Sequence, residues 1–308
     1  MIGLAAVFVI LGPGSAVSQP PQQAPVIGRW DLTVQGPDGT FPSWLEVELS
    51  GNRTLVGRFV ARSGSARPVS KVEFTNNTMR FAIPPQWEQG ENDLRVEGTL
   101  DGDKLSGWMT DPAGVRLTWT AVRAPALRRS GEPTWGSPIR LFNGSDLTGW
   151  EPTGGTNQWR VVGGVLTSPK AGTNLVTKQT FTDFKLHAEF RYPRAGNSGL
   201  YLRGRHEVQI EDSKGMEPGS HHMGGVYGFL TPNEDAALNA GDWQTYDITL
   251  VGRLVTVVLN GKTVISQQEI PGITGGALNS DEGSPGPLML QGDHAPVEFR
   301  SIVLTPAR

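Results

Sequence analysis

The sequence has no cysteine among its 308 residues, and this absence removes several kinds of site. Disulfide bonds, thiolate–metal centres and a cysteine nucleophile are all excluded. Charged residues make up only 19% of the chain, and the formal net charge is −3. A charge this small and negative attracts neither nucleic acid nor an anionic membrane surface, so we expect neither as a partner.

Long helical patterns with charged faces are also missing. The chain instead has 40 glycines, 23 prolines and β-branched runs throughout, which predicts an all-β protein with many turns. There is no Walker loop, no His-Glu-x-x-His motif and no serine nucleophile elbow, and we expect no cofactor. Nine tryptophans are present; they are frequent in carbohydrate binders but also fill protein cores.

The N-terminal apolar run at residues 2–11 is too short to cross a bilayer as a helix, so we expect no transmembrane segment. Small residues at Ala16 and Ser18 fit signal-peptidase cleavage, and residues 1–18 are predicted to be the signal peptide of a secreted or periplasmic protein. The signal is atypical because no lysine or arginine precedes the run. A start further upstream or a disordered apolar tail are the alternatives.

Two β domains are predicted downstream of a Pro/Gln-rich linker at residues 19–26. Residues 27–124 contain about eight short strands separated by turns, which predicts a small antiparallel barrel with a packing or spacer role. Residues 125–137 read as a second linker. Residues 138–308 contain about ten or more strands and a hairpin signal at Asn260-Gly261, which predicts a jelly-roll sandwich of two antiparallel sheets.

Residues 183–212 hold the candidate site, because apolar and polar residues alternate there with a period of two. We expect the polar positions to share one concave wall with hydrocarbon on its reverse. These positions are Lys185, His187, Glu189, Arg191, Tyr201, Arg203, Glu207, Gln209 and Glu211. Such side chains suit sugar hydroxyls and proton transfer.

A series of motifs within residues 138–306 carries a family resemblance. They are L-F-N-G-S-D-L-T-G-W (141–150), W-R-V-V-G-G-V-L (159–166), F-x-D-F-K-L-x-x-E-F-R (181–191), N-S-G-L-Y-L-R-G (197–204), E-V-Q-I-E-D (207–212), W-Q-T-Y-D-I-T-L-V-G (243–252), G-P-L-M-L-Q (286–291) and V-E-F-R-S-I (297–302). Together, in this order, they resemble the 3-keto-disaccharide hydrolase family. The resemblance implies a concanavalin-like β-sandwich, usually exported by bacteria, that acts on glycosides whose C3 hydroxyl has been oxidised to a ketone.

Chemistry on such a substrate differs from ordinary glycoside hydrolysis. A C3 ketone acidifies the C2–H bond, so a base can remove that proton, the C1 oxygen can leave by β-elimination, and water can then add. This route needs a base, an acid for the leaving oxygen and donors for the enolate oxygen. Ordinary glycosidases flank an oxocarbenium-like centre with two carboxylates, so the sequence does not separate the two routes.

Three carboxylates are candidate catalytic groups. Glu189 is the leading candidate base, with His187 and Arg191 at i−2 and i+2; the alternative is a structural salt bridge. Glu207 is the second, and Asp212 is expected at the rim of the site. The alternative for Glu207 is a buried cross-strand hydrogen-bond ladder.

The predicted substrate-binding residues are His187, Arg191, Tyr201, Arg203, Gln209, Gln291 and Arg300. Arg203 and Arg300 could donate to the ketone or enolate oxygen, or else pair with nearby glutamates. The adjacent His221 and His222 diverge in an extended segment, so we predict no metal site there. His294 could shuttle a proton, although capping a turn is the simpler interpretation.

Three functions remain open from the sequence. The first is an enzyme that cleaves 3-keto-glycosides. The second is a lectin-like, non-catalytic binding protein of the cell envelope, because one fold can serve either purpose. The third is a structural envelope protein whose polar residues only satisfy one another.

Overall fold

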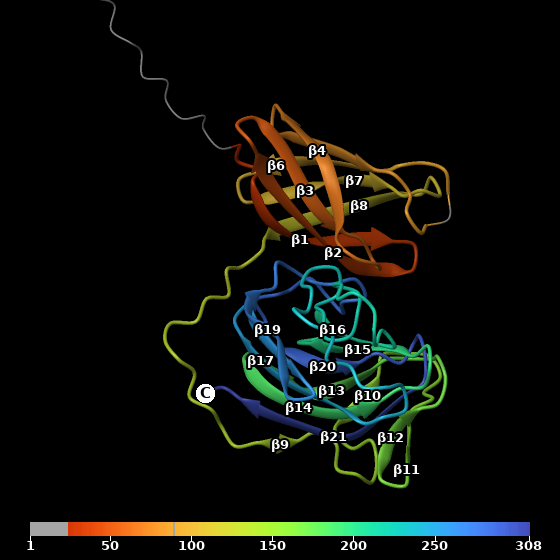
Figure 1. Cartoon of the computed structure of the whole chain (residues 1–308). Helices are drawn as coiled ribbons and strands as arrows, with labels where there is room; N and C mark the ends of the chain where they lie inside the picture. The colour runs from red at the N-terminus through yellow and green to blue at the C-terminus, as the bar shows by residue number, and fades with distance from the viewer. Residues whose placement is uncertain (1–23, 89) are drawn as a thin grey trace, which may run out of the picture.

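The computed structural model describes residues 24–88 and 90–308, all of whose regular elements are β-strands. The chain builds a barrel followed by a sandwich, as Figure 1 shows. The predicted all-β class is therefore confirmed. The signal peptide expected at residues 1–18 and most of the following spacer lie outside the described residues. Within the described residues there is no helix that is long and apolar enough to cross a membrane.

Eight antiparallel strands close the barrel, because β1 pairs with both β2 and β8. The strands are β1 (Gly28–Gly36), β2 (Gly39–Ser50), β3 (Thr54–Val60), β4 (Arg67–Thr75), β5 (Thr78–Ile83), β6 (Leu94–Asp101), β7 (Lys104–Thr110) and β8 (Arg116–Arg123). Alternating side chains such as Leu94 and Val96 point inward, and Trp30 and Trp119 fill the centre. The barrel is thus packed with its own hydrocarbon.

The sandwich consists of two antiparallel sheets. The five-stranded sheet runs in the order β10 (Trp150–Pro152), β13 (Leu175–Phe181), β20 (Gly286–Leu290), β15 (Asn197–Leu202) and β16 (His206–Glu211). The larger sheet runs in the order β11 (Arg160–Val162), β12 (Val165–Ser168), β21 (Val297–Pro306), β14 (Phe184–Arg191), β17 (Gln244–Val251), β18 (Leu254–Leu259) and β19 (Lys262–Glu269), and β9 (Ile139–Arg140) pairs with β21.

Both sheets contribute their apolar faces to one core. Leu186 and Phe190 of β14 pack in the same cluster as Leu200 of β15 and Val208 of β16. Because β14 belongs to one sheet and β15 and β16 to the other, their polar faces point away from each other. The expectation of a single polar wall is therefore wrong. The period-two pattern identifies the face of each strand but does not say which sheet the strand joins.

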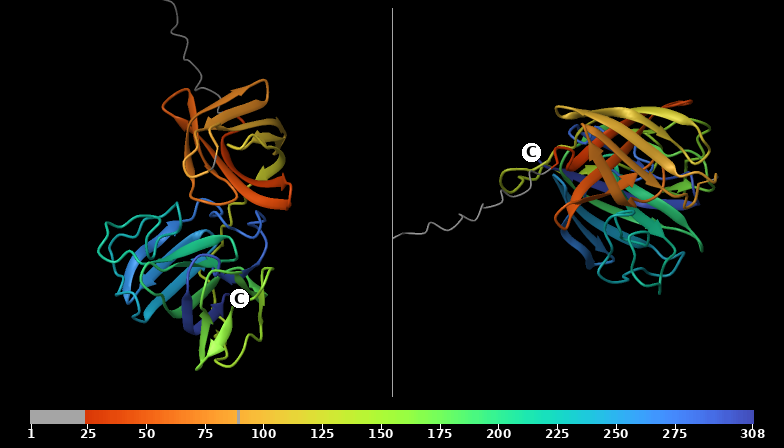
Figure 2. Two further views of the ribbon diagram at one scale, coloured as in Figure 1. Left: turned by 90° about the vertical axis from the view of Figure 1, so that its right-hand side faces the viewer. Right: turned by 90° about the horizontal axis from the view of Figure 1, so that it is seen from above.

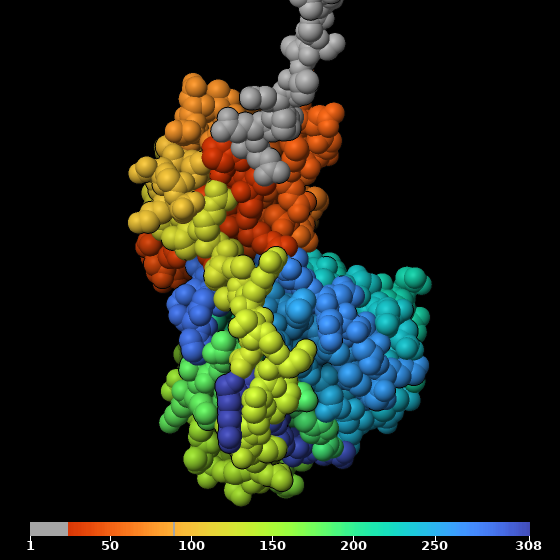
Figure 3. Space-filling model, turned by 90° about the vertical axis from the view of Figure 1, so that its left-hand side faces the viewer, coloured from red at the N-terminus to blue at the C-terminus, as the bar shows by residue number. Residues whose placement is uncertain are grey.

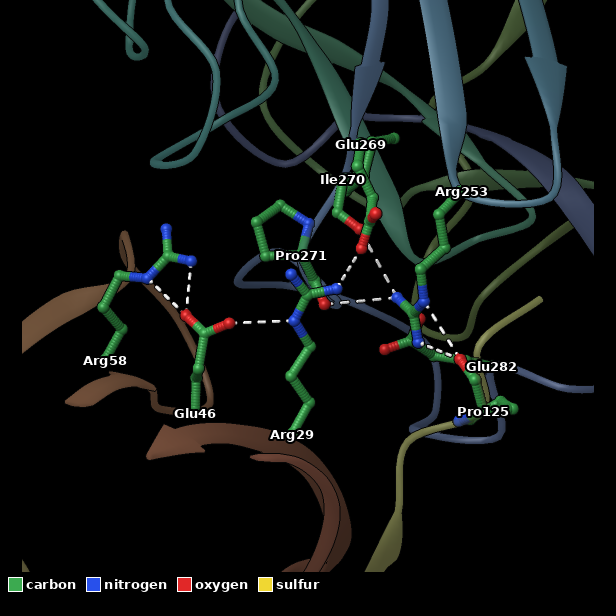
Figure 4. A network of polar contacts seen from close by, with 9 residues as sticks. All are labelled: Arg29, Glu46, Arg58, Pro125, Arg253, Glu269, Ile270, Pro271 and Glu282. Atoms are coloured by element: carbon green, nitrogen blue, oxygen red, sulfur yellow. Dashed lines mark hydrogen bonds and ion pairs between the residues drawn. The ribbon is translucent and has the colours of Figure 1, made fainter. Parts of the chain in front are cut away.

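The barrel lies against one end of the sandwich, and polar contacts join the two (Figures 2 and 4). Glu46 of β2 accepts hydrogen bonds from Arg29 and Arg58, and Arg29 also pairs with Glu269 at the end of β19. Nearby, Asp31 of β1 lies buried beside Glu282, and burial together with the Glu282 charge raises the pKa of Asp31. A neutral Asp31 therefore spares the interface a second buried negative charge.

The connecting segment after β8 runs along the surface of the sandwich beside the C-terminal residues (Figure 3). The N–H of Gly136 donates to the Pro306 carbonyl, and the N–H of Arg308 donates to the Thr134 carbonyl. Arg253 of the sandwich donates to the carbonyl of Pro125 at 2.8 Å. These bonds fix the segment against the sandwich.

Candidate functional site

The outer face of the larger sheet carries Glu189, the leading sequence candidate. Arg300 donates to Glu189 Oε2 at 2.5 Å, and His187 Nδ1 lies 2.8 Å from Asp247 Oδ1. Arg191 pairs with Glu298 on the neighbouring strand. His187, Glu189 and Arg191 thus already have partners on adjacent strands, as the salt-bridge alternative for Glu189 required.

The outer face of the five-stranded sheet carries a different polar set, arranged in a row across three strands. Gly199 of β15 lies opposite Gln209 of β16, and the N–H of Gln291, just after β20, donates to the Gly199 carbonyl at 2.9 Å. A Cβ atom on Gly199 would lie 2.3 Å from Glu207 Oε1. The Glu207 carboxyl therefore occupies the space that the missing Gly199 side chain leaves between the two glutamines.

Glu207 is the most perturbed carboxyl on this face. Its exposed fraction is only 3%, and this burial raises its pKa to about 8, while the hydrogen bond from Tyr201 and the charge of His294 act in the opposite direction. A carboxyl that titrates near neutral pH can both accept and return a proton under mild conditions.

Tyr201 completes a short hydrogen-bond chain with Glu207. Its hydroxyl lies 2.8 Å from Glu207 Oε2 and 2.9 Å from the carbonyl oxygen of Gly275. When Glu207 is ionised, the hydroxyl can donate to the carboxylate. When Glu207 is protonated, the carboxyl can donate to the Tyr201 oxygen while the hydroxyl turns to Gly275. Either protonation state of Glu207 is thus accommodated.

Three buried acceptors on the same face as Glu207 lack a hydrogen-bond partner among the described residues. They are Gln209 Oε1, Gln291 Oε1 and Glu211 Oε2. Buried polar atoms are nearly always paired in proteins. A ligand that presents hydroxyl donors, as a sugar does, would supply the partners that this face lacks.

His294 and Asp293 follow β20 and lie at the edge of the same face. His294 Nδ1 is 2.6 Å from Asp293 Oδ1, and this hydrogen bond is the main cause of a raised His294 pKa. Asp293 also lines a hollow of about 800 Å³, whose other walls are residues 153–158 and 170–174. The hollow is therefore lined by the hydrogen-bond partner of His294, a histidine whose charge lowers the pKa of Glu207.

The loop after residue 219 extends this face beyond β16. The N–H of Tyr227 donates to the Glu207 carbonyl, and the Tyr227 ring packs edge-on against His221 at 5.0 Å between centroids. His222 turns away, with its Nδ1 2.8 Å from the Glu217 carbonyl oxygen. The sequence interpretation missed Tyr227; its only signal was the motif G-G-V-Y-G. In the described part of the chain, His, Asp and Glu form no group of three or more that could hold a metal ion.

Two other predicted residues take structural positions. Arg203 has a left-handed backbone (φ 55°), and its guanidinium turns into the protein, where it binds Asp183 and the Gly252 carbonyl. The tight turn after β15 breaks the alternation on which its placement beside Tyr201 depended. Asp212 accepts the N–H of Ala195 at 2.8 Å and so supports the turn before β15.

The predicted site residues thus divide into three groups. Tyr201, Glu207, Gln209 and Gln291 come together on the five-stranded sheet. His187, Glu189, Arg191 and Arg300 come together on the opposite sheet. Arg203 and Asp212 belong to neither group, because both side chains are engaged in turns.

Comparisons with known proteins bear on the sandwich. Residues 137–305 match the model of a family described as the 3-keto-alpha-glucoside-1,2-lyase-like domain, which confirms the resemblance seen in the sequence. A solved structure from Parabacteroides distasonis ATCC 8503, described as a "putative glycosyl hydrolase", is 29% identical; the alignment covers 57% of this chain and 92% of that chain, with a TM-score of 0.48. A second structure with the same description and organism is 20% identical over 55% of this chain and 93% of its own, with a TM-score of 0.46. None of the curated proteins compared matches this chain.

Proposed function

We propose that this chain, which belongs to the family of 3-keto-alpha-glucoside-1,2-lyase-like domains, cleaves 3-keto-glycosides on the outer face of its five-stranded sheet. Family membership supports a carbohydrate-related hydrolase function. The observation that carries the finer proposal is Glu207, a buried carboxyl with a pKa of about 8 that lies between two unpartnered amide oxygens. An acid–base group and acceptors for hydroxyl donors therefore stand in one place.

In the proposed mechanism, Glu207 is the base. Its carboxylate takes the C2 proton, and the electron pair of the C–H bond forms the enolate of the C3 ketone. The enolate then expels the C1 oxygen, which gives a C1=C2 double bond conjugated to the ketone. Water then adds at C1 and gives up one proton to the general acid that had protonated the leaving oxygen, while Glu207 returns its proton to C2, so the net reaction is hydrolysis. Burial suits this role, because it makes the carboxylate a stronger base.

His294 is the proposed acid for the leaving oxygen. Its pKa is raised by Asp293, so the imidazolium form persists to a higher pH than in an exposed histidine. The hollow beside Asp293 gives room for the leaving group. Gln209 and Gln291 would accept hydroxyl hydrogens of the oxidised ring through their unpartnered Oε1 atoms.

Two isosteric variants test which face carries the chemistry. Glu207→Gln should lower kcat for a chromogenic 3-keto-glucoside by about 10²- to 10⁴-fold, as expected for loss of a general base. Glu189→Gln, on the opposite sheet, should leave turnover near the wild-type value. Turnover that survives the first change and collapses in the second would move the site to the Glu189 face.

Solvent deuterium separates elimination from direct hydrolysis. In D₂O the proposed route places a deuteron at C2 of the released sugar when the proton held by Glu207 exchanges with solvent before it returns, and mass spectrometry would detect this label. The corresponding glucoside with an unoxidised C3 should be inert, because its C2–H bond is not acidified. A product without label at C2 would mean either direct displacement at C1 or return of the original proton. A primary kinetic isotope effect with substrate deuterated at C2 separates these two, because only the elimination route breaks the C2–H bond. Calorimetric binding of keto sugars without any cleavage would favour the lectin-like alternative.

We also propose that the protein is exported after cleavage following Ser18. The proposal rests on the apolar run and the small residues near Ser18. N-terminal sequencing of the protein recovered from its native host tests it: a mature chain beginning at Gln19 is expected, and one that retains the apolar run would contradict it.

A further inference from the structure

Residues 270–277, here called the bridging loop, contact the Glu207 side of the sandwich. Thr274 Oγ1 accepts the backbone N–H of Glu207 at 3.0 Å. The Gly275 carbonyl oxygen lies 2.9 Å from the Tyr201 hydroxyl. The bridging loop therefore contacts both members of the Glu207–Tyr201 pair and helps to set their positions.

The opposite side of the bridging loop lies directly on the barrel. The N–H of Gly276 donates to the Arg62 carbonyl at 3.1 Å. A Cβ atom on Gly275 would lie 2.2 Å from the carbonyl oxygen of Gly64, so the two backbones approach as closely as glycine allows. The loop has no room to move toward the barrel.

A small apolar cluster, separate from the barrel core and the sandwich core, holds this contact. Its buried members are Trp44, Val60, Ile273 and Ala277. Trp44 extends from β2 with no exposed surface, and its ring packs edge-on against Phe229 at 5.3 Å between centroids. A Cβ atom on Gly272 would lie 2.2 Å from the Trp44 indole. Trp44 is thus a barrel residue whose packing is directed at the sandwich.

Among the described residues, the groups with the largest effect on the pKa of Glu207 lie outside the barrel. The hydrogen bond and charges that act on Glu207 come from Tyr201, His294 and Asp293, all in the sandwich. Tyr227, whose own pKa responds to the Glu207 charge, belongs to the sandwich as well. The barrel therefore influences Glu207 through segments that contact both, namely the bridging loop and the segment that contains Tyr227 and Phe229.

We propose that the barrel is a positioning domain, in which Trp44 and the backbone at Arg62 and Gly64 hold the bridging loop against β15 and β16 and so keep the Glu207–Tyr201 pair buried and in place. Trp44 is a positioning residue, because it acts on Glu207 through the segments that it packs against, chiefly the bridging loop and also Phe229. The expected effect of this positioning on catalysis rests on the proposed function of Glu207, whereas the positioning of the Glu207–Tyr201 pair by the barrel does not depend on that function.

Trp44→Ala in the full chain tests the positioning directly. Loosening the loop admits water to Glu207 and frees the Tyr201 hydroxyl from Gly275, and both effects lower the pKa of Glu207. We expect the Glu207 carboxyl, followed by ¹³C NMR and assigned with Glu207→Gln, to titrate about one unit or more below the wild type. Trp108→Ala is the matched control, since Trp108 stacks with Arg116 on the barrel and lies outside the loop cluster. It should leave the titration unchanged.

Kinetics give a second readout. Trp44→Ala should lower kcat by about tenfold or more and move the pH profile to lower pH, because a displaced carboxylate loses its alignment with C2. Gly275→Ala gives an independent perturbation from the loop side, through its clash with Gly64, if Trp44→Ala does not fold. A folded variant of either kind with the wild-type Glu207 titration would overturn the positioning role. If the wild type cleaves no 3-keto-glycoside, the proposed reaction fails, yet the titration still decides whether the barrel positions Glu207.

Discussion

Replacing Arg203 by methionine probes a side chain that the sequence assigned to the substrate and the structure places inside the protein. Arg203 is 1% exposed. Its Nε donates to the Thr182 carbonyl at 2.5 Å, and its Nη2 donates to the Gly252 carbonyl at 2.7 Å and pairs with Asp183 Oδ1 at 3.2 Å. Methionine keeps most of the length of the side chain but removes every donor.

The expected cost follows from these partners. Breaking a buried ion pair by removing one member costs about 3–5 kcal/mol when the other charge is left unpaired. Asp183 is not left unpaired, because it still accepts the N–H of Gly252 at 2.8 Å and pairs with Arg129. We therefore expect the lower end, about 3 kcal/mol, which corresponds to a fall in Tm of about 6–12 °C for a domain of this size.

Thermal unfolding by circular dichroism measures this change, and Arg160→Met on the exposed part of β11 serves as the control, with an expected change within about 0.5 kcal/mol. Cleavage by folded Arg203→Met, assayed well below its Tm, should match the wild type. An Arg203→Met variant with the wild-type Tm but no cleavage activity would refute the structural role and would support direct binding of substrate by Arg203.

Three further predictions concern the buried carboxyls. Gly199→Ala should fold but lose about 100-fold in kcat, because its Cβ displaces the flexible Glu207 carboxyl; wild-type turnover would show that the space over Gly199 is not required. Tyr201→Phe should move the Glu207 titration to higher pH, because the Tyr201 hydroxyl lowers the Glu207 pKa in the wild type and the variant lacks this hydrogen bond. A shift to lower pH in the NMR titration would contradict this. Burial beside Glu282 raises the pKa of Asp31, so between the ordinary aspartate pKa and this raised value the folded state holds a proton that the unfolded state has lost. The free energy of unfolding should therefore fall as pH rises through this range. Denaturant unfolding at several pH values measures this dependence, and the free energy of unfolding should fall less steeply with pH in Asp31→Asn than in the wild type. Part of the dependence should remain, because the raised pKa of Glu207 acts in the same direction. An unchanged dependence in Asp31→Asn would mean that another group titrates.

The sequence by itself determined the β class, the order of barrel and sandwich, and the inward face of each strand. Alternation in Phe184–Arg191 and His206–Glu211 did place the apolar residues in the core and residues such as Glu189 and Glu207 on the opposite face of each sheet. This information is local, because successive side chains of any strand point to opposite faces regardless of what the strand pairs with. Tyr201, Glu207 and Gln209 were placed on the polar face in this way, whereas Gln291 came from the motif G-P-L-M-L-Q.

Only the tertiary structure decided which polar faces meet. In the larger sheet, Glu189 of β14 lies opposite Ser301 of β21 and Thr245 of β17. In the five-stranded sheet, Glu207 of β16 lies opposite Tyr201 of β15. Strand pairing depends on partners far along the chain, and one left-handed residue at Arg203 was enough to redirect a side chain. The raised pKa of Glu207 likewise depends on burial beneath a loop more than sixty residues away, held by a separate barrel. Pairing and burial are properties of the packed molecule, and no period in the sequence records them.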